Sequence, residues 1–378
     1  MLGVAVGTMA LVIVLSVFNG LEGLIRSLYN SFDADLKISL NEGKFFELDD
    51  ALGGAIDETP GIAGIASIME DNILIKYNGG EAVVRMKGVD KAALYKNRLA
   101  EKVTEGTFKL TDEAENFAVI GRGIRYELAI NPRNDFLALQ FYYPKDIKPG
   151  VTNPSSMYNS GILKPAGVFA IEKQYDEKYV FVPLRFARKL IGKPNKLTAI
   201  ELMIAEDYKI GDVQESLKKK LSGKYEILNS DEQHASLLRA VKIEKLFLYL
   251  TFSFILAVAS FNIYFSLTML ALDKKKDISI MHAIGFKDKL IRNIFLFEGA
   301  IISFSGAIAG GLIGFIICII QQQYGLISMG MASAVTDAYP VKMELLDFLL
   351  TILTIIVITF LAAIQPAIKA MRFNKVER

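Results

Sequence analysis

Residues 273–315 have the sequence DKKKDISIMHAIGFKDKLIRNIFLFEGAIISFSGAIAGGLIGF, in which a charged segment leads into a long apolar run. That run is too long for the core helix of an ordinary soluble domain, and another apolar run precedes the charged segment. Six basic residues lie between the two runs: Lys274, Lys275, Lys276, Lys287, Lys289 and Arg292. Because basic residues concentrate in the cytoplasmic loops of membrane proteins, residues 273–293 are predicted to be such a loop.

The same loop contains apolar residues at helical spacing. Ile278, Met281, Ile284 and Ile291 fall close to the period of a helix. The pattern predicts one amphipathic helix that lies along the membrane face instead of crossing it. We expect such a helix to contact a partner.

The composition divides the chain into a membrane part and an aqueous part. It has 378 residues, 52% of them hydrophobic, a mean hydropathy of +0.33 and no Trp. The net charge is only +2 and the basic residues sit in short clusters beside apolar runs, so the charge gives no indication of nucleic-acid binding. One cysteine, Cys318, lies within an apolar run, which excludes a disulfide framework and a cysteine-based metal site.

Four apolar runs are long enough to cross a bilayer: Leu2–Phe18, Leu246–Leu272, Ile294–Ile320 and Leu345–Ile364. The first could be misread as a signal peptide, but it lacks a positively charged start and continues into FNGLEGLIRSL, so a retained span is favoured. Basic residues Lys369, Arg372, Lys375 and Arg378 place the C-terminus in the cytoplasm.

The predicted fold class is an integral membrane protein with four transmembrane helices and a large extracytoplasmic α+β domain between helices one and two. The expected segments are 1–34 (first helix and its extension), 35–240 (outer domain), 241–272, 273–293 (cytoplasmic loop), 294–320, 321–344 (short outer loop), 345–366 and 367–378 (cytoplasmic tail).

The outer domain alternates strand and helix patterns, which predicts two small lobes, one inserted in the other. A hairpin is expected around Asn78-Gly79-Gly80, and strands at 166–171 and 179–182 are predicted to pair. Asp231–Glu244 is predicted to be helical without a break and to continue into the second span, which would link the outer domain rigidly to the membrane.

Residues 145–164 (KDIKPGVTNPSSMYNSGILK) are rich in Pro, Gly, Ser and Asn, so regular structure is not expected there. Either the segment is a solvated insertion, or it is a protruding contact arm with Pro154, Met157 and Tyr158 near its tip.

Small residues mark the helix contacts. Gly3 and Gly7 in the first span, and Gly306, Gly310 and Gly314 in the third, have the spacing that lets helices approach closely. Two polar residues in the spans can have either a structural or a functional role. Asn262 is expected to hydrogen-bond a neighbouring helix, and Glu298 to reach water or pair with Arg292 in preference to relaying protons.

No motif for catalysis is present in the sequence. It has no G-x-x-x-x-G-K-[ST] phosphate loop and no G-x-S-x-G, and LSGKY at 221–225 only superficially resembles a transporter signature. His234 and His282 are predicted to lie on opposite sides of the membrane. The chain is therefore expected to be a non-catalytic subunit that binds no cofactor.

Residues 240–314, together with VIVLSVFNGLE at 12–22, resemble the lipoprotein-releasing permeases of the LolC/LolE type, within the FtsX-like and MacB-like permease superfamily. DISIMHAIGF at 277–286, the F-x-x-E-G of Phe295 to Gly299 and the glycine ladder are typical of the superfamily. VLSVFNG at 14–20 and AVASFNI at 257–263 point to the lipoprotein-releasing branch. The family has a cytoplasmic helix before the first span, so a lead-in is expected before Met1, and the end RFNKVER is shorter than the family's tail.

The resemblance implies a mechanism and its partners. Two permease subunits, identical or sister chains, would pair in the bacterial inner membrane, and a separate LolD-like ATPase that uses ATP and Mg would dock on the loop helix. The implied contacts are Ile278, Met281, Ile284, Gly285 and Phe286. An acylated lipoprotein would bind against Phe18, Leu21, Leu246, Leu250 and Phe254. The alternative interpretation is that these five residues face lipid or pack against other helices. The arm at 145–164 would recruit a LolA-like periplasmic carrier.

Two other functions stay open. A MacB-like permease would use the same mechanics to expel a soluble periplasmic substrate, and an FtsX-like scaffold would activate a periplasmic hydrolase without transporting anything.

Overall fold

The structure is a computed structural model, and it describes residues 1–90, 99, 102–112, 115–132, 137–145, 157–221, 223–329 and 338–372. These residues form two compact units. The helical unit contains residues 1–25 and the described residues from 236 onward. The β-rich unit contains the described residues of 26–235.

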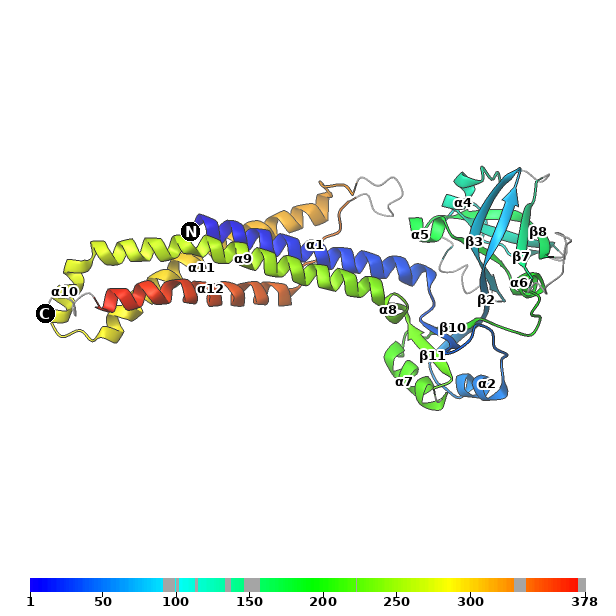
Figure 1. Cartoon of the computed structure of the whole chain (residues 1–378), viewed down its shortest axis with the longest axis horizontal. Helices are drawn as coiled ribbons and strands as arrows, with labels where there is room; N and C mark the ends of the chain where they lie inside the picture. Colours follow the sequence, from blue (N-terminus) through cyan, green and yellow to red (C-terminus); the bar gives the residue numbers. More distant parts are fainter. Residues whose placement is uncertain are drawn as a thin grey trace. The chain divides into compact units, whose positions relative to one another are not determined.

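The described residues of the helical unit form four long helices and one short one (Figure 1). The long helices are α1 (Leu2–Phe32), α9 (Ala235–Asp273), α11 (Asp288–Tyr324) and α12 (Leu345–Arg372), and the short one is α10 (Lys275–Ala283). By length and composition each long helix can cross a membrane. Their many exposed Leu, Ile and Phe side chains are those expected of helices in lipid.

Glycines set the distances between these helices. A Cβ added at Gly3 would lie 3.3 Å from the Cβ of Ala259 on α9, and one at Gly7 would lie 2.7 Å from Cδ1 of Leu256. A side chain at Gly3 would press on Ala259, and one at Gly7 would displace the end of the Leu256 side chain, so small residues favour the close approach of α1 to α9.

The three predicted packing glycines of α11 face α1. A Cβ at Gly306 would lie 2.9 Å from the carbonyl oxygen of Met1, at Gly310 2.0 Å from that of Ala5, and at Gly314 3.2 Å from that of Met9. The absence of side chains lets the backbone of α1 lie directly on α11.

The β-rich unit contains an eleven-stranded sheet among its described residues. The main strand order is β11-β1-β10-β2-β3-β9-β6-β8-β4; β5 pairs with β6, and β7 pairs with both β2 and β8. The strands are β1 (Leu36–Leu40), β2 (Ile62–Tyr77), β3 (Gly80–Val89), β4 (Val103–Gly106), β5 (Thr111–Asp112), β6 (Glu115–Gly121), β7 (Leu139–Pro144), β8 (Tyr158–Phe169), β9 (Tyr179–Pro183), β10 (Ala199–Ile204) and β11 (Tyr225–Asn229). The helices are α2 (Asp50–Asp57), α4 (Arg122–Glu127), α5 (Lys173–Asp176), α6 (Leu184–Ile191), α7 (Ile210–Lys220) and α8 (Ser230–Gln233).

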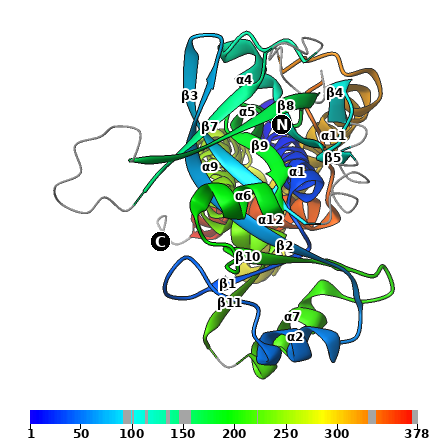
Figure 2. The ribbon, with the colours of Figure 1, turned by 90° about the vertical axis from the view of Figure 1, so that its right-hand side faces the viewer.

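This sheet has a base and an inserted part. The base holds β1, β10 and β11 with α2 and α7 (Figure 2). The inserted part, from β3 to β9, comes from the chain between β2 and β10. The sixteen-residue β2 pairs with β10 of the base at its start and with β3 along the rest of its length. The chain from β3 to β9 is thus inserted between two neighbouring strands of one sheet, and the predicted division into two lobes stays a prediction.

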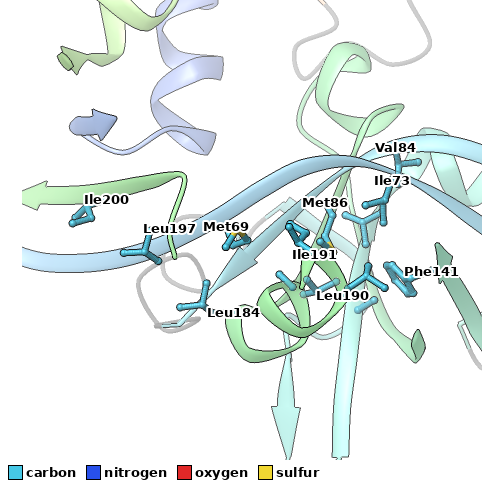
Figure 3. Close-up of a cluster of buried hydrophobic side chains, with 14 of the residues drawn as sticks. Met69, Ile73, Val84, Met86, Phe141, Leu184, Leu190, Ile191, Leu197 and Ile200 are labelled. Carbon is cyan, nitrogen blue, oxygen red and sulfur yellow. The ribbon is translucent and has the colours of Figure 1, made fainter. Parts of the chain in front are cut away.

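Alternating apolar residues build the core of this unit. Helix α6 has buried Leu184, Leu190 and Ile191 along one side, and these pack with Met69 of β2 and Met86 of β3 (Figure 3). The predicted hairpin between β2 and β3 is confirmed. Asn78 and Gly79 have φ of 45° and 85°, which is the twist that a two-residue hairpin turn needs.

Four sequence predictions differ from the structure. Strands β8 and β9 do not pair, because β6 lies between them. Residues 158–164 are not irregular, because they form the start of β8 and pair with β7. The helix from Asp231 is not continuous: α8 ends at Gln233, His234 is its C-cap, and α9 begins at Ala235.

The fourth difference concerns the cytoplasmic loop. The single amphipathic helix is instead the short α10, which ends at Ala283, followed by a turn and the start of α11 at Asp288. Gly285, at φ 97°, allows the backbone to turn here. Ile291 therefore lies in α11 and not in the loop helix.

Candidate functional site

Helix α10 is held to the helical unit by its inner face. Ile278 is 3% exposed and Met281 is partly buried, and both pack in a cluster with Ala271, Ile291, Phe295, Ala367 and Ala370. The predicted contacts Ile278 and Met281 are thus turned inward. Their burial fixes the position of α10 against α9, α11 and α12.

The exposed apolar residues of this region form a patch, which we name the coupling patch: Ile280, Ile284 and Phe286. Their exposed fractions are 57%, 72% and 41%. The turn that carries Ile284 and Phe286 is fixed by hydrogen bonds from the Phe286 amide to the Met281 carbonyl and from the Gly285 amide to the His282 carbonyl. Ile280 was not predicted, although its position four residues before Ile284 was a usable signal.

The predicted acyl-chain residues fall into two groups. Leu246, Leu250 and Phe254 are four residues apart along α9, with exposed fractions of 57%, 57% and 70%, so they form one exposed apolar stripe. Phe18 and Leu21 on α1 are half-buried. A hydrogen bond from Lys245 to Asn19 brings these two stretches of α1 and α9 to the same level of the helical unit.

A buried polar cluster lies beside that level, and we name it the polar clasp: Asn19, Lys245 and Asp347. The Lys245 Nζ lies 2.6 Å from the Asn19 Oδ1 and 3.2 Å from the Asp347 Oδ1, and the Asn19 Nδ2 lies 2.5 Å from the Asp347 Oδ2. The clasp joins α1, α9 and α12. Sequence reasoning missed it because charges near the ends of apolar runs also occur as membrane boundaries.

An apolar cavity of about 320 Å³ opens between α1, α11 and α12. Gly311, Phe315 and Ile352 are among its lining residues. Gly311 has nothing within 4 Å of a hypothetical Cβ, whereas its neighbour Gly310 is in close contact with α1. Asn262 and Glu298 lie on exposed faces of α9 and α11.

The described residues of the predicted contact arm, 145 and 157–164, continue the pairing of β7 with β8, and residues 146–156 lie outside the described residues. The Lys145 amide donates to the Met157 carbonyl, so the hairpin ladder continues beyond Pro144 and Tyr158. Tyr158 is exposed and Met157 is half-buried. Pro154 lies outside the described residues.

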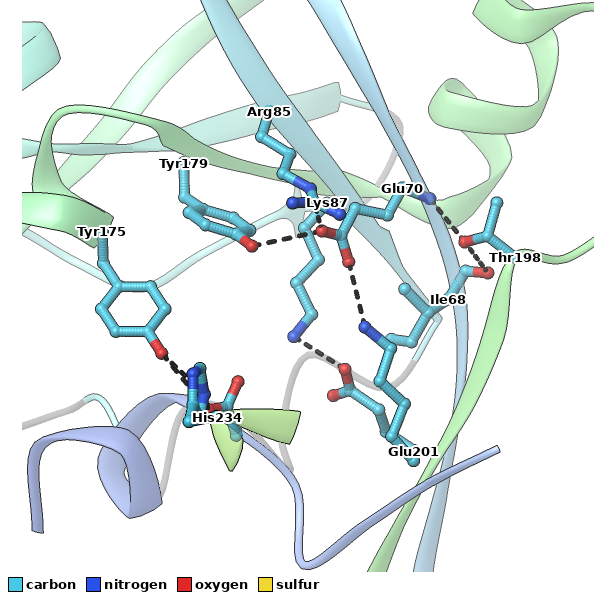
Figure 4. A network of polar contacts seen from close by, with 11 residues as sticks. Ile68, Glu70, Arg85, Lys87, Tyr175, Tyr179, Thr198, Glu201 and His234 are labelled. Carbon is cyan, nitrogen blue, oxygen red and sulfur yellow. Dashed lines mark hydrogen bonds and ion pairs between the residues drawn. The ribbon is translucent and has the colours of Figure 1, made fainter. Parts of the chain in front are cut away.

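A buried ionic network crosses the shared sheet (Figure 4). The Lys87 Nζ on β3 lies 2.9 Å from the Glu201 Oε1 on β10, and Arg85 pairs with Glu70 on β2. Burial lowers the pKa of Lys87, but Glu201 and Glu70 raise it more, so that pKa lies above its ordinary value. Burial raises the pKa of Glu70, but Lys37, Lys87 and Arg85 together bring it below its ordinary value. The network ties the base to the inserted part with both signs of charge satisfied.

Comparisons with known proteins agree with this division of the chain. Residues 1–220 match the model of the MacB-like periplasmic core domain, and residues 249–375 match the FtsX-like permease C-terminal model. The chain belongs to the MacB-like and FtsX-like permease family. The permease is 22% identical over 391 residues to the "Lipoprotein-releasing system transmembrane protein LolC" of Xylella fastidiosa strain 9a5c, covering 100% of this chain and 91% of that protein.

Two further relatives have the same character. The "Lipoprotein-releasing system transmembrane protein LolE" of Haemophilus influenzae is 23% identical to the permease, covering 99% of this chain and 91% of that protein. A LolC protein of Buchnera aphidicola is 25% identical, covering 97% of this chain and 88% of that protein. The predicted resemblance and fold class are confirmed: the permease is a multi-pass inner-membrane protein whose β-rich unit is periplasmic.

The described part of the permease offers no evident metal centre. Within it, no group of three or more His, Cys, Asp or Glu side chains is placed to hold an ion.

Proposed function

We propose that the permease is the membrane subunit of an ABC transporter that extracts acylated lipoproteins from the outer leaflet of the inner membrane and hands them to a periplasmic carrier. The observation that carries the proposal is the similarity to LolC and LolE proteins along essentially the whole chain.

Energy enters at the coupling patch. A separate cytoplasmic ATPase binds ATP and Mg and docks on Ile280, Ile284 and Phe286, which are exposed beside a turn held by backbone hydrogen bonds. The permease itself is non-catalytic and binds no cofactor. Since Ile278 anchors α10 to the bundle, a push on the patch moves the helices behind it.

Helix α9 carries the movement. Its 39 residues form one helix about 58 Å long at 1.5 Å per residue, roughly twice the thickness of the hydrocarbon core. Because the helix is continuous over this length, a displacement at its cytoplasmic end is passed to its periplasmic end.

The lipoprotein's acyl chains lie against the stripe of Leu246, Leu250 and Phe254, with Phe18 and Leu21 alongside. Each CH₂ that leaves hydrocarbon for water costs about 0.8 kcal/mol, so extraction needs an apolar wall to replace the lipid. A second permease subunit, identical or a sister chain, closes the wall. The β7–β8 arm receives the LolA-like carrier, with Met157 and Tyr158 as contacts, and Pro154, which lies outside the described residues, is a further predicted contact.

Photo-cross-linking tests the proposal. A photoreactive residue at Phe254 or Phe18 is expected to capture an acylated lipoprotein, and one at Phe297, which is exposed on α11, is the control. Recovery of a lipoprotein from Phe254 but not from Phe297 supports the proposal. Recovery of an adaptor protein for efflux, or of a periplasmic hydrolase, with no lipoprotein would favour the MacB-like or the FtsX-like function instead.

A further inference from the structure

The end of α1 and the start of α9 are linked within the β-rich unit. Asp33 directly follows the last residue of α1, and His234 directly precedes the first residue of α9. The His234 Nε2 lies 2.5 Å from the Asp33 Oδ2. The His234 ring stacks on the Tyr29 ring, with centroids 3.6 Å apart and planes 7° from parallel. Two helices that continue into the membrane unit are therefore fastened to each other at their periplasmic ends.

A third side chain connects this pair to the inserted part of the sheet domain. The Tyr175 hydroxyl on α5 donates to the Asp33 Oδ2 at 3.2 Å and lies 3.3 Å from the His234 Nε2 (Figure 4). Burial, followed by the charge of Asp33, raises the pKa of Tyr175, so the hydroxyl keeps its proton and remains a donor. We name Tyr29, Asp33, Tyr175 and His234 the joint.

Phe32 holds α1 to the same place by packing. Its side chain is fully buried, with its ring centroid 4.1 Å from that of Tyr175 and 4.7 Å from that of Tyr179. The Lys87 ammonium lies 4.7 Å from the Phe32 ring centroid, and Lys87 pairs with Glu201. The last turn of α1 thus contacts the inserted part directly and reaches the base through one ion pair.

The joint lies where the helix from the membrane is interrupted. Helix α8 is fixed to β11 by a capping box, in which the side chains of Asn229 and Glu232 each accept from the other's backbone amide. His234 has the non-helical backbone angles φ −113° and ψ 23°, and α9 starts at the next residue. A break of one residue lets the angle between α8 and α9 change, while the side chain of the same residue holds Asp33.

We propose that the joint passes the displacement of α1 and α9 into the periplasmic domain, and that Asp33, Tyr175 and His234 are positioning residues that link ATP hydrolysis to lipoprotein release. The inference rests on the proposed function. If the cluster only stabilised the fold, its loss would lower stability, ATP hydrolysis and lipoprotein release together. If it acts as the joint, its loss lowers lipoprotein release and leaves ATP hydrolysis unchanged.

The test uses the complete transporter in proteoliposomes with its ATPase, an acylated lipoprotein and the soluble carrier. The ATPase rate and the lipoprotein released per ATP are measured for His234→Ala, Asp33→Asn and Tyr175→Phe. We expect ATPase rates within twofold of the native transporter. Release per ATP is expected to fall at least tenfold for the first two variants and about threefold for Tyr175→Phe, which removes only a hydroxyl and keeps the ring packing.

Two further variants control for indirect effects. His234→Gln places an amide near the position of the ring Nε2 and is expected to restore at least half of the native release per ATP. Lys224→Ala breaks an exposed ion pair with Asp49 in the same unit and is expected to change neither activity. Native release per ATP in both His234→Ala and Tyr175→Phe would overturn the inference, as would failure of His234→Gln to restore any release.

A second measurement keeps this inference separate from the proposed function. If the native transporter releases no lipoprotein, the proposed function fails, and the joint is then tested by hydrogen exchange of β2 and β10 with and without a non-hydrolysable ATP analogue. Nucleotide is expected to change exchange in the native transporter and not in His234→Ala. An equal change in both would refute the joint whatever the cargo is.

Discussion

Replacing Gly310 by Ala tests the contact between α11 and α1. A Cβ at Gly310 would lie 2.0 Å from the Ala5 carbonyl oxygen, whereas ordinary van der Waals contact begins at 3.4 Å. Nothing lies within 4 Å of a Cβ built at the adjacent Gly311. Because both glycines are in the same helix, Gly311→Ala is a matched control for the change in helix propensity.

The geometry gives the size of the effect. To accept Gly310→Ala, α1 and α11 must separate by about 1.4 Å, since a backbone carbonyl cannot rotate away as a side chain can. Overpacking costs about 1–3 kcal/mol, and Ala in place of Gly in a helix returns up to about 1 kcal/mol. The two variants are expected to differ by about 2 kcal/mol, or roughly 4–8 °C in Tm for a unit of this size.

Thermal unfolding in one detergent, at one scan rate, measures the difference. Gly310→Ala is expected to lower Tm, and Gly311→Ala to leave it unchanged or raise it. Equal Tm values for the two variants would show that α1 does not lie on α11 as described, and that the spacing of the glycines has another cause.

Three further outcomes are expected. Ile284→Asp puts a charge in the coupling patch and should reduce co-purification of the ATPase at least tenfold. Lys276→Ala is the control and should keep binding. Equal binding by the two variants would exclude the patch as the docking site of the ATPase. Lys245→Ala leaves the Asp347 carboxylate buried without its cation and should lower the free energy of unfolding by about 3 kcal/mol. The double variant Lys245→Met with Asp347→Leu should restore most of that stability. If the single and double variants unfold alike, the polar clasp does not act as a unit. Burial raises the pKa of Asp176 from 3.8 to about 6, so its contribution to stability is full below about pH 4 and is lost as pH rises through 6. Between pH 4 and 7 the native permease should therefore lose about 2 kcal/mol more than Asp176→Asn, and parallel pH profiles of the two would contradict the raised pKa.

Local patterns predicted the parts of the fold that local physics determines. The four apolar runs gave the four long helices, and Asn78 with Gly79 gave the β2–β3 hairpin, because these residues accept positive φ at low cost. The spacing of Gly306, Gly310 and Gly314 indicated a helix contact. It did not indicate that the partner is α1, which depends on tertiary packing.

Long-range pairing was outside the reach of such patterns. Strands β8 and β9 have strand-like sequences, but they do not pair with each other. Strand β6, from earlier in the chain, lies between them and pairs in parallel with β8 and antiparallel with β9. The break at His234 was equally hidden. The sequence around it is helix-forming, and the interruption coincides with the contact of His234 with Asp33, 201 residues earlier.

The end of α10 has a local signal. A continuous helix through Gly285 is the prediction from apolar periodicity, but a glycine after an apolar helical run is a common signal for a helix end. Its φ of 97° ends α10 and turns Ile284 and Phe286 outward, while Ile278 is buried. The structure gives the positions and exposure of the predicted acyl-chain residues and of the described part of the carrier arm. The roles of these residues stay predictions.

The shared strand β2 has a consequence for how such permeases diversify. The chain leaves the base along β2 and returns to it along β10, so everything from β3 to β9 is a cassette that the chain enters once and leaves once. A new cassette with different recognition loops can be exchanged there if it keeps the contacts that Tyr175 makes with Asp33 and Lys87 makes with Glu201. Chimeras with boundaries in β2 and β10 would be the natural way to transplant specificity from one permease to another.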